Sequence, residues 1–200
     1  MNIRISGDTA VRQQLQAIGK QMPFALSVAL NGTANAVQQA VRGGLGEKFT
    51  LRRRTFVERT IFRDRATDFA TKTKPQATVR VNPSSDFLAK FEKGDTKTPR
   101  DGRSIAIPTV NARRTKSDIV TTANRPRALL DKPGHFRFGD VLYATKGRGK
   151  RQKLIALFVF KRSARIRPRL GMEDTAGRVV PDVWELQASR AIERALSTAR

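Results

Sequence analysis

The side chains best able to do chemistry in this sequence are its arginines and lysines, whose chemistry is contact with anions. The segment RSARIRPR carries Arg165, Arg167 and Arg169 at alternate positions, so an extended backbone would point all three the same way. Arginine matches the oxygens of phosphates and carboxylates bidentately. A solvated face without a specific partner is the alternative, and for these three residues we favour anion contact.

Two further basic groups are present. One surrounds a predicted turn, GRGKRQ, and its candidate contacts are Arg148, Lys150 and Arg151. For this turn we favour a solvated face over anion contact. The other group is the run RRR at residues 52–54, and it is not expected to form one binding patch, because consecutive residues of a helix spread around its axis.

The charge of the whole chain is strongly unbalanced. It has 40 Lys and Arg against 17 Asp and Glu, a net charge of +23. Residues 96–172 alone contain 20 basic and four acidic residues. So much self-repulsion destabilises a lone compact chain and favours a partner that neutralises it. Nucleic acid, an anionic surface and an acidic protein all meet that requirement.

Catalytic and metal-binding arrangements are absent from the sequence. The chain has no Cys and one His, His135, which excludes disulfides, thiol chemistry and Cys-based zinc sites. GRGK at residues 147–150 lacks the spacing of a phosphate-binding loop. Asp64 and Asp68 could share a helix face, but the surrounding RDRATD predicts ordinary ion pairs. We therefore predict no enzyme activity, catalytic residue, metal, cofactor or small-molecule substrate.

Apolar spacing predicts four helices along the chain. The first covers residues 9–21, and the second begins after Pro23 and ends in a glycine-rich stretch near residue 45. A third, shorter helix is predicted at residues 51–62. A closing amphipathic helix begins at Pro181, with an apolar stripe of Trp184, Ala188, Ile192 and Ala195.

Alternating and apolar segments predict the strands. Residues 76–82 read as a strand with one side in water, and residues 104–109 as a strand with Ile105 and Ile107 inward. Residues 140–146 and 153–162 form a predicted hairpin. Its second strand is central, because residues 154–160 are apolar on both faces, with Phe158 and Phe160 in the core.

These elements predict an α+β fold: a long central helix and a C-terminal helix packed on a small, mainly antiparallel β-sheet with long extended loops. We expect one domain over residues 1–200. It has a helical part at 1–65, a basic β-rich part at 76–170 and the C-terminal helix at 178–200. The loops at 83–103 and 111–139 are long enough to suggest that they reach other subunits.

The second predicted helix is unusual because residues 21–41 contain no charged side chain. The stretch is too polar to span a membrane. Either this helix is central in the monomer and covered on most sides, or its outer face packs on another subunit, and both can hold together. The candidate subunit-interface residues are Asn31, Asn35, Gln38 and Gln39.

The order of these parts resembles a family of phage proteins. An uncharged helix (FALSVALNGTANAVQQAV), a basic segment (LRRRTFVERTIFRDRAT) and an alternating strand (PQATVRVN) follow one another between residues 24 and 82. A very basic middle and a closing helix come next. The succession is similar to that of the minor tail protein Z family and related tail-completion (neck) proteins of long-tailed bacteriophages. The long middle region does not align with that family.

The resemblance implies a structural role in the virion, in the tail or neck, after synthesis in the host cytoplasm. A ring of subunits, a hexamer first and a dodecamer second, would complete the head-proximal end of the tail tube and help to make the tail competent for head joining. Its partners would be the tail terminator or tube protein, the head–tail connector proteins and the genomic DNA end, with no membrane. The alternative is a non-specific nucleic-acid-binding protein that uses a basic sheet face.

Overall fold

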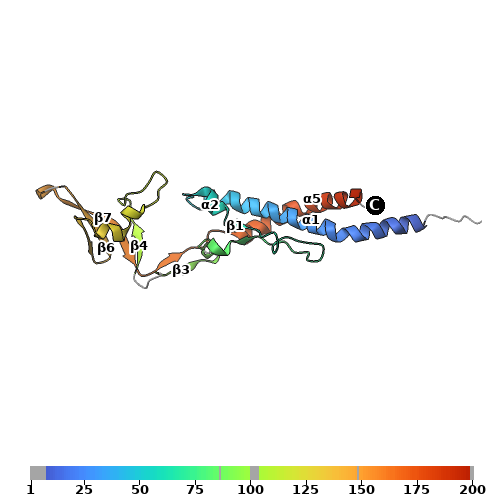
Figure 1. The fold of residues 1–200 in the computed structure, drawn as a ribbon, viewed down its shortest axis with the longest axis horizontal. Coiled ribbons are helices and arrows are strands. Elements are labelled where there is room, and N and C mark those ends of the chain that lie inside the picture. Colours follow the sequence, from blue (N-terminus) through green and yellow to red (C-terminus); the bar gives the residue numbers. More distant parts are fainter. Residues whose placement is uncertain (1–7, 86, 100–103, 148, 199–200) are drawn as a thin grey trace, which may run out of the picture. The chain divides into compact units, whose positions relative to one another are not determined.

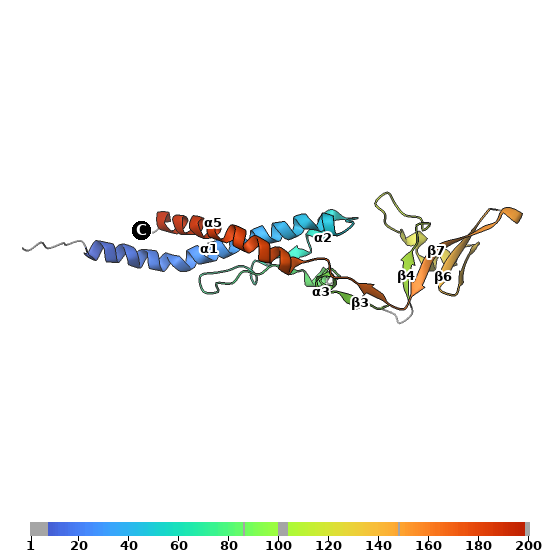
Figure 2. The same cartoon turned by 180° about the vertical axis from the view of Figure 1, so that it is seen from behind.

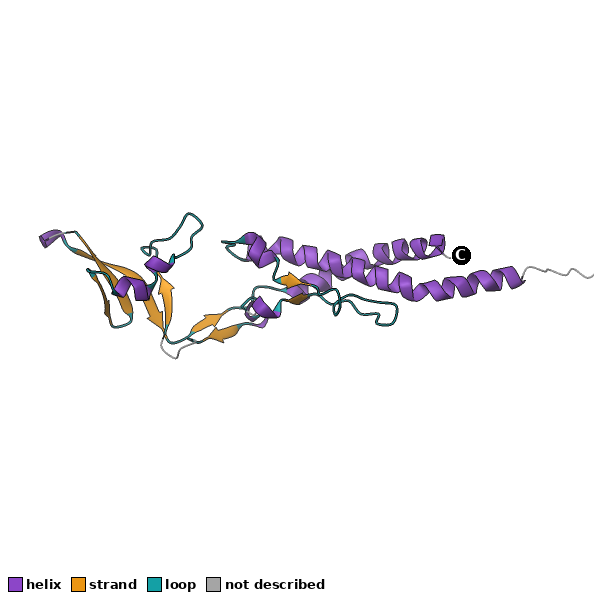
Figure 3. Cartoon of the chain, in the orientation of Figure 1, coloured by secondary structure: helices purple, strands orange, loops and turns teal. Residues whose placement is uncertain are grey.

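The computed structural model describes residues 8–85, 87–99, 104–147 and 149–198, and it has the predicted α+β fold (Figure 3). The chain divides into two compact units. The helical unit comprises the described residues among 1–49, 55–89 and 170–200, and the sheet unit those among 50–54 and 90–169. The chain therefore enters the sheet unit twice, briefly at residues 50–54 and then over residues 90–169, and each time returns to the helical unit.

Two long antiparallel helices lie side by side in the helical unit (Figures 1 and 2). They are α1, Asp8–Lys48, and α5, Met172–Thr198. The end of α1 meets the start of α5, where Nζ of Lys48 donates to the carbonyl oxygen of Leu170 at 2.6 Å. The seam between the helices is built from small residues, which allow the two axes to approach closely. These seam residues are Ala25, Ala29, Ala191 and Ala195.

Replacing Ala29 with Leu should destabilise the helical unit by about 1–3 kcal/mol, because the larger side chain has no space in the seam. Ala29 is only 2% exposed. Urea unfolding followed by far-UV circular dichroism measures the effect. Gln16→Leu on an exposed part of α1 is the control, and its effect should stay within about 0.5 kcal/mol. Equal stability of the two variants would contradict close packing of α1 on α5 at Ala29.

α1 is one continuous helix, so the predicted break at Pro23 is wrong, whereas its end at Lys48 lies close to the predicted end near residue 45. Pro23 lies inside the helix, where it leaves one carbonyl of the preceding turn without its helical donor. The axis of α1 changes direction within its N-terminal half (Figure 1). Similarly, α5 begins before Pro181. Packing between the two long helices outweighs these local signals, as is usual for helices in proteins.

The segment after α1 contains two very short strands. β1, Ile61–Phe62, pairs antiparallel with β2, Arg80–Val81. The buried Ile61 accepts hydrogen bonds on its carbonyl oxygen from Nε2 of Gln38 at 3.0 Å and from Arg42 at 2.7 Å. The predicted helix at 51–62 is thereby reduced to α2, Arg54–Glu58, and the predicted strand at 76–82 to β2. Bonds from distant side chains hold Ile61 in extended backbone, which local propensity does not reveal.

A four-stranded antiparallel sheet forms most of the sheet unit, in the order β4–β7–β6–β5. The strands are β4, Ile105–Pro108; β5, His135–Phe138; β6, Val141–Lys146; and β7, Lys153–Lys161. The predicted hairpin and its central second strand are confirmed. One face of the sheet packs on a small core. Its buried members are Ala112, Leu129, Leu142, Phe158 and Phe160.

Short elements occupy the two segments that were predicted as long loops. A two-stranded ribbon joins β3, Asp95–Lys97, to β8, Ala164–Ile166. The remaining short helices are η1, Pro83–Ser85; α3, Lys90–Lys93; η2, Thr122–Asn124; α4, Pro126–Leu130; and η3, Gly149–Arg151. Leu129 of α4 contributes directly to the core of the sheet unit.

Two predictions of side-chain direction are wrong. Ile105 and Ile107, both predicted to point inward, lie on the sheet face opposite the core, where Ile107 is 38% exposed, and it is Ala106 between them that packs against the core of the sheet unit. In α5, Ile192 is exposed and Ala191 takes its place in the seam. In both cases the larger apolar residue was assumed to be the buried one, whereas the neighbouring alanine permits closer packing.

Candidate interaction surfaces

Positive charge is concentrated in the sheet unit. Segments 50–54 and 90–169 contain 25 Lys and Arg against 6 Asp and Glu, which gives +19 of the total +23. The rest of the chain has 15 basic and 11 acidic residues, a net charge of +4. A surface dominated by one sign of charge attracts partners of the opposite sign. The sheet unit is therefore the candidate anion-contacting part of the molecule.

The three alternating arginines lie along and beyond β8. Arg165 stands opposite Thr96 in the β3–β8 ribbon, and both Arg165 and Arg167 are exposed. Arg169 is engaged within the chain. Its guanidinium lies 5.3 Å from the ring centre of Phe91, and its backbone N–H donates to the Phe91 carbonyl. All three arginines are therefore exposed, and Arg169 is in addition held against the short helix α3.

The basic turn between β6 and β7 contains η3. Arg151 is exposed there, Lys150 belongs to η3, and Arg148 lies outside the described residues. Lys146 and Lys153 stand directly opposite each other at the end of the hairpin. Like charges in this position destabilise an antiparallel pair. An anion held between them would relieve that repulsion.

The four polar candidates on α1 separate into two pairs. Asn31 donates from Nδ2 to the carbonyl oxygen of Ala70 at 2.9 Å, and Gln38 makes the bond to β1 described above. Asn35 and Gln39 are exposed and lie one helical turn apart. Asn31 and Gln38 therefore hold the chain's own backbone, as expected for a helix covered within the monomer. Asn35 and Gln39 remain accessible to a second molecule.

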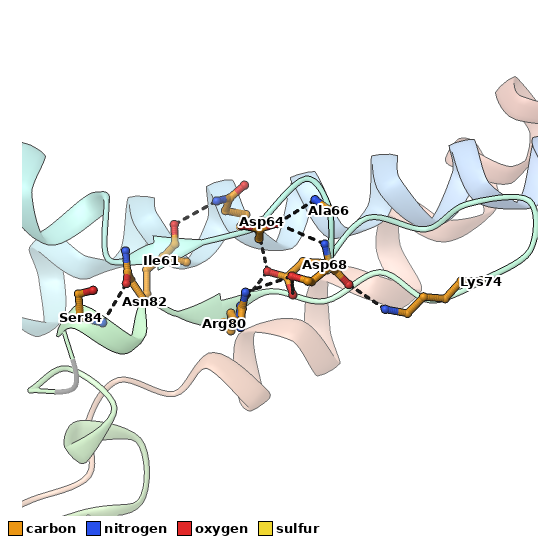
Figure 4. Close-up of polar contacts among 10 residues, drawn as sticks. Ile61, Asp64, Ala66, Asp68, Lys74, Arg80, Asn82 and Ser84 are labelled. Atoms are coloured by element: carbon orange, nitrogen blue, oxygen red, sulfur yellow. Dashed lines mark hydrogen bonds and ion pairs between the residues drawn. The ribbon is translucent and has the colours of Figure 1, made fainter.

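A buried carboxylate organises the segment between β1 and β2 (Figure 4). Asp68 is 4% exposed, and its Oδ2 accepts from Nε of Arg80 at 2.8 Å and from the Asp64 N–H at 2.7 Å. Burial alone would raise the pKa of Asp68, but the bonds from Asp64, Arg80 and Thr67 together hold that pKa below its usual value. Asp68 thus forms an ion pair as predicted, but with Arg80 and not with an arginine of the RDRATD segment, and the pair holds this segment against β2.

Asp118 fastens the 50–54 segment within the sheet unit. Its carboxylate accepts from Arg114 at 2.7 Å and from Nε of Arg52 at 2.9 Å. The hydrogen bond from Arg114, followed by that from Arg52, holds the pKa of Asp118 below its usual value. Arg52 is consequently engaged in an internal ion pair, which agrees with the expectation that residues 52–54 do not act as one patch.

No protein-family model, curated protein or solved structure matches this chain. Its function is therefore inferred from its own surfaces. Two features of these surfaces are relevant to function. The net positive charge lies largely in the sheet unit, and the exposed polar pair Asn35 and Gln39 lies in the helical unit.

Two further features of the described residues concern clusters of metal-ligating side chains and long apolar helices. Across them, no group of three or more His, Cys, Asp or Glu side chains could hold an ion. His135 lies on the edge strand β5, with Nδ1 3.2 Å from the carbonyl oxygen of Pro133. No helix in the described ranges is long and apolar enough to cross a membrane.

Proposed function

We propose that this chain is a structural protein of a long-tailed phage that completes the head-proximal end of the tail tube and helps to make the tail competent for head joining. It acts as a ring of subunits, a hexamer or a dodecamer, in the neck of the virion. It needs no cofactor and performs no catalysis. Its other partners are the tail terminator or tube protein, the head–tail connector proteins and the DNA end in the channel.

The segregation of charge is the observation that carries this proposal. Copies of a chain with a net charge of +23 repel one another, and the repulsion is strongest between their +19 sheet units. The +4 helical unit is the part through which copies can meet. The sheet unit is then left to bind an acidic neighbour, for which complementary charge speeds docking and fixes its register.

Imaging of particles that lack this chain tests the proposal. Its deletion from the encoding phage should leave unjoined heads and tails, and the unaltered gene supplied in trans should restore complete virions. Asn35→Lys with Gln39→Lys should fail to restore them, because like charges brought together in a subunit contact cost several kcal/mol. The purified double variant should also have a lower oligomeric mass by light scattering.

A matched variant separates this effect from added charge alone. Thr122→Lys with Gln152→Lys adds the same charge at exposed positions of the sheet unit, and it should preserve the oligomeric mass. Normal virions after deletion of the gene would exclude the tail role. An Asn35 and Gln39 double variant of unchanged mass would exclude this face of α1 from the ring.

The +19 of the sheet unit also favours a second function, non-specific binding of nucleic acid. In that case, affinity for duplexes of unrelated sequence would fall steeply with salt, with a slope that reports several released counterions. Fluorescence anisotropy at increasing salt concentrations measures this slope. Tight, salt-sensitive DNA binding by a monomeric chain would favour the second function over the first.

A further inference from the structure

The sheet of the sheet unit has a second face, opposite its core, that is apolar and accessible. Strand pairing places Ile107 beside Val159, Val159 beside Val141, and Val141 beside Phe138. Directly paired residues of neighbouring strands lie on the same face of a sheet. One apolar row therefore crosses all four strands, from β4 to β5. We name it the apolar row.

Two more cross-strand sets extend this face. Phe136 pairs with Tyr143, their rings stack at 5.9 Å between centroids, and Tyr143 pairs with Ala156. Leu154 pairs with Thr145 farther along the same hairpin. Alternation along β5 and β6 puts these residues on the face of the apolar row. Conversely, Arg137 pairs with the fully buried Leu142, and its guanidinium lies 4.3 Å from the ring centre of Phe160 on the core side.

The large side chains on this face are open to solvent. Phe138 is 76% exposed, Leu154 60%, Phe136 39% and Ile107 38%. A contiguous apolar patch of this kind is uncommon on a soluble protein and marks an interaction site. The core face of the same sheet is covered by α4 and its neighbouring loops. The exposed face is therefore a specific, unpartnered surface.

The charge around the patch restricts its partner. Lys161 pairs with Ile105 and so belongs to the same face, in a unit with a net charge of +19. A second copy would bring an equal positive charge against it. Nucleic acid would match the charge, and its bases stack on aromatic rings. However, only one of the four residues of the apolar row, Phe138, offers a ring for stacking, and Phe136 beside the row already stacks on Tyr143.

We propose that this face binds a protein whose contact surface has an apolar centre and an acidic rim. The apolar centre would cover the apolar row, and the acidic rim would meet Lys161 and the other basic residues of the sheet unit. An apolar core within a charged rim is the usual anatomy of a protein–protein interface. The identity of this partner as a protein of the tail end rests on the proposed function.

Tails purified from particles that lack this chain provide the probe. We expect the unaltered chain to bind these tails in a cosedimentation titration. Phe138→Ser with Leu154→Ser should weaken binding at least tenfold, because exposed apolar anchors at the centre of an interface dominate its affinity. Both side chains are largely exposed, so the free chain should keep its stability and its oligomeric mass. Val110→Ser with Leu130→Ser, at other exposed apolar positions of the sheet unit, is the matched control.

The possible outcomes separate the two proposals. Undiminished binding by the Phe138 and Leu154 variant overturns the docking face and leaves the tail function standing. Failure of the unaltered chain to bind tails overturns both. A changed oligomeric mass identifies a second copy as the occupant, and a tenfold loss of affinity for an oligothymidine strand identifies nucleic acid. Either of these two results contradicts the inference.

Discussion

Phe158→Ala should lower the free energy of unfolding of the sheet unit by about 3–5 kcal/mol. Phe158 is 3% exposed and packs with Leu142 and Phe160 in a core of only five buried residues. A domain is typically stable by about 5–15 kcal/mol, so this loss would remove a large share of the stability of the unit. Of the two phenylalanine rings in this cluster, Phe158 is the more deeply buried.

Hydrogen exchange followed by mass spectrometry measures the effect in each unit separately. We expect amides of β6 and β7 to lose protection, while those of α1 and α5 keep it, because the two units have separate cores. Phe138→Ala in the same sheet is the control, and its effect should be within about 0.5 kcal/mol since its ring is mostly in water. Equal loss of protection in both units would contradict independent cores.

Elements held by interactions between residues close in the sequence were predicted accurately, and elements held by interactions between distant residues were not. The β6–β7 hairpin was predicted nearly to its ends because its pairing is local and β7 is apolar on both faces. β1 and β2 were not, because Gln38 and Arg42 hold Ile61 from a distant part of the chain. A pattern within ten residues cannot report such a contact. The division into two units is non-local in the same sense, since residues 50–54 join the sheet unit through Asp118.

The sequence could not decide whether the uncharged stretch of α1 is covered within the monomer or packs on another subunit. Asn31 and Gln38 serve backbone groups of the chain itself, whereas Asn35 and Gln39 face outward. Asparagine and glutamine can satisfy buried carbonyl groups without the desolvation penalty of a buried charge. The same composition also suits a contact between two positively charged copies. Contacts within the monomer therefore explain Asn31 and Gln38, and Asn35 and Gln39 are left for the subunit contacts of the proposed ring.

The exposed sheet face was missed for an identifiable reason. HFRF at residues 135–138 alternates aromatic and polar side chains, but it lies within a segment that was treated as a loop. Ile107 was assigned to the core because it is larger than Ala106. Cross-strand pairing is what brings Ile107 and Phe138 into one row, although they lie 31 positions apart in the sequence. The spacing of apolar residues within one strand cannot distinguish a covered face from an open one.

Asp68→Ala should destabilise the helical unit by about 2–3 kcal/mol. The substitution leaves the guanidinium of Arg80 and the N–H of Asp64 without their acceptor in a mostly buried position. Removal of one partner from a fully buried ion pair costs more, but Arg80 is two-fifths exposed and water compensates part of the loss. Asp64→Asn is the control, because Asn can accept the same turn-forming bond from Ala66.

The effect of Asp68 should also depend on pH in a defined direction. Its pKa is lower in the folded chain than the usual value of 3.8, so the folded state binds fewer protons than the unfolded state. The stability that the carboxylate supplies is fully present above that usual value and is lost as the pH falls through the folded pKa. Asp118 and Asp95 also have lowered pKa values, and they make the sheet unit less stable in acid in the same direction.

Asp68→Asn isolates this contribution because it keeps an oxygen acceptor and removes the charge. Unfolding by urea at a series of pH values below 5 should give a flatter dependence for Asp68→Asn than for the unaltered chain. The pH dependence of the sheet unit should be unchanged, since Asp95 and Asp118 keep their cationic partners. An identical slope in the two proteins would mean that Arg80 and the Asp64 N–H do not hold the charged form of Asp68, and that its burial serves packing alone.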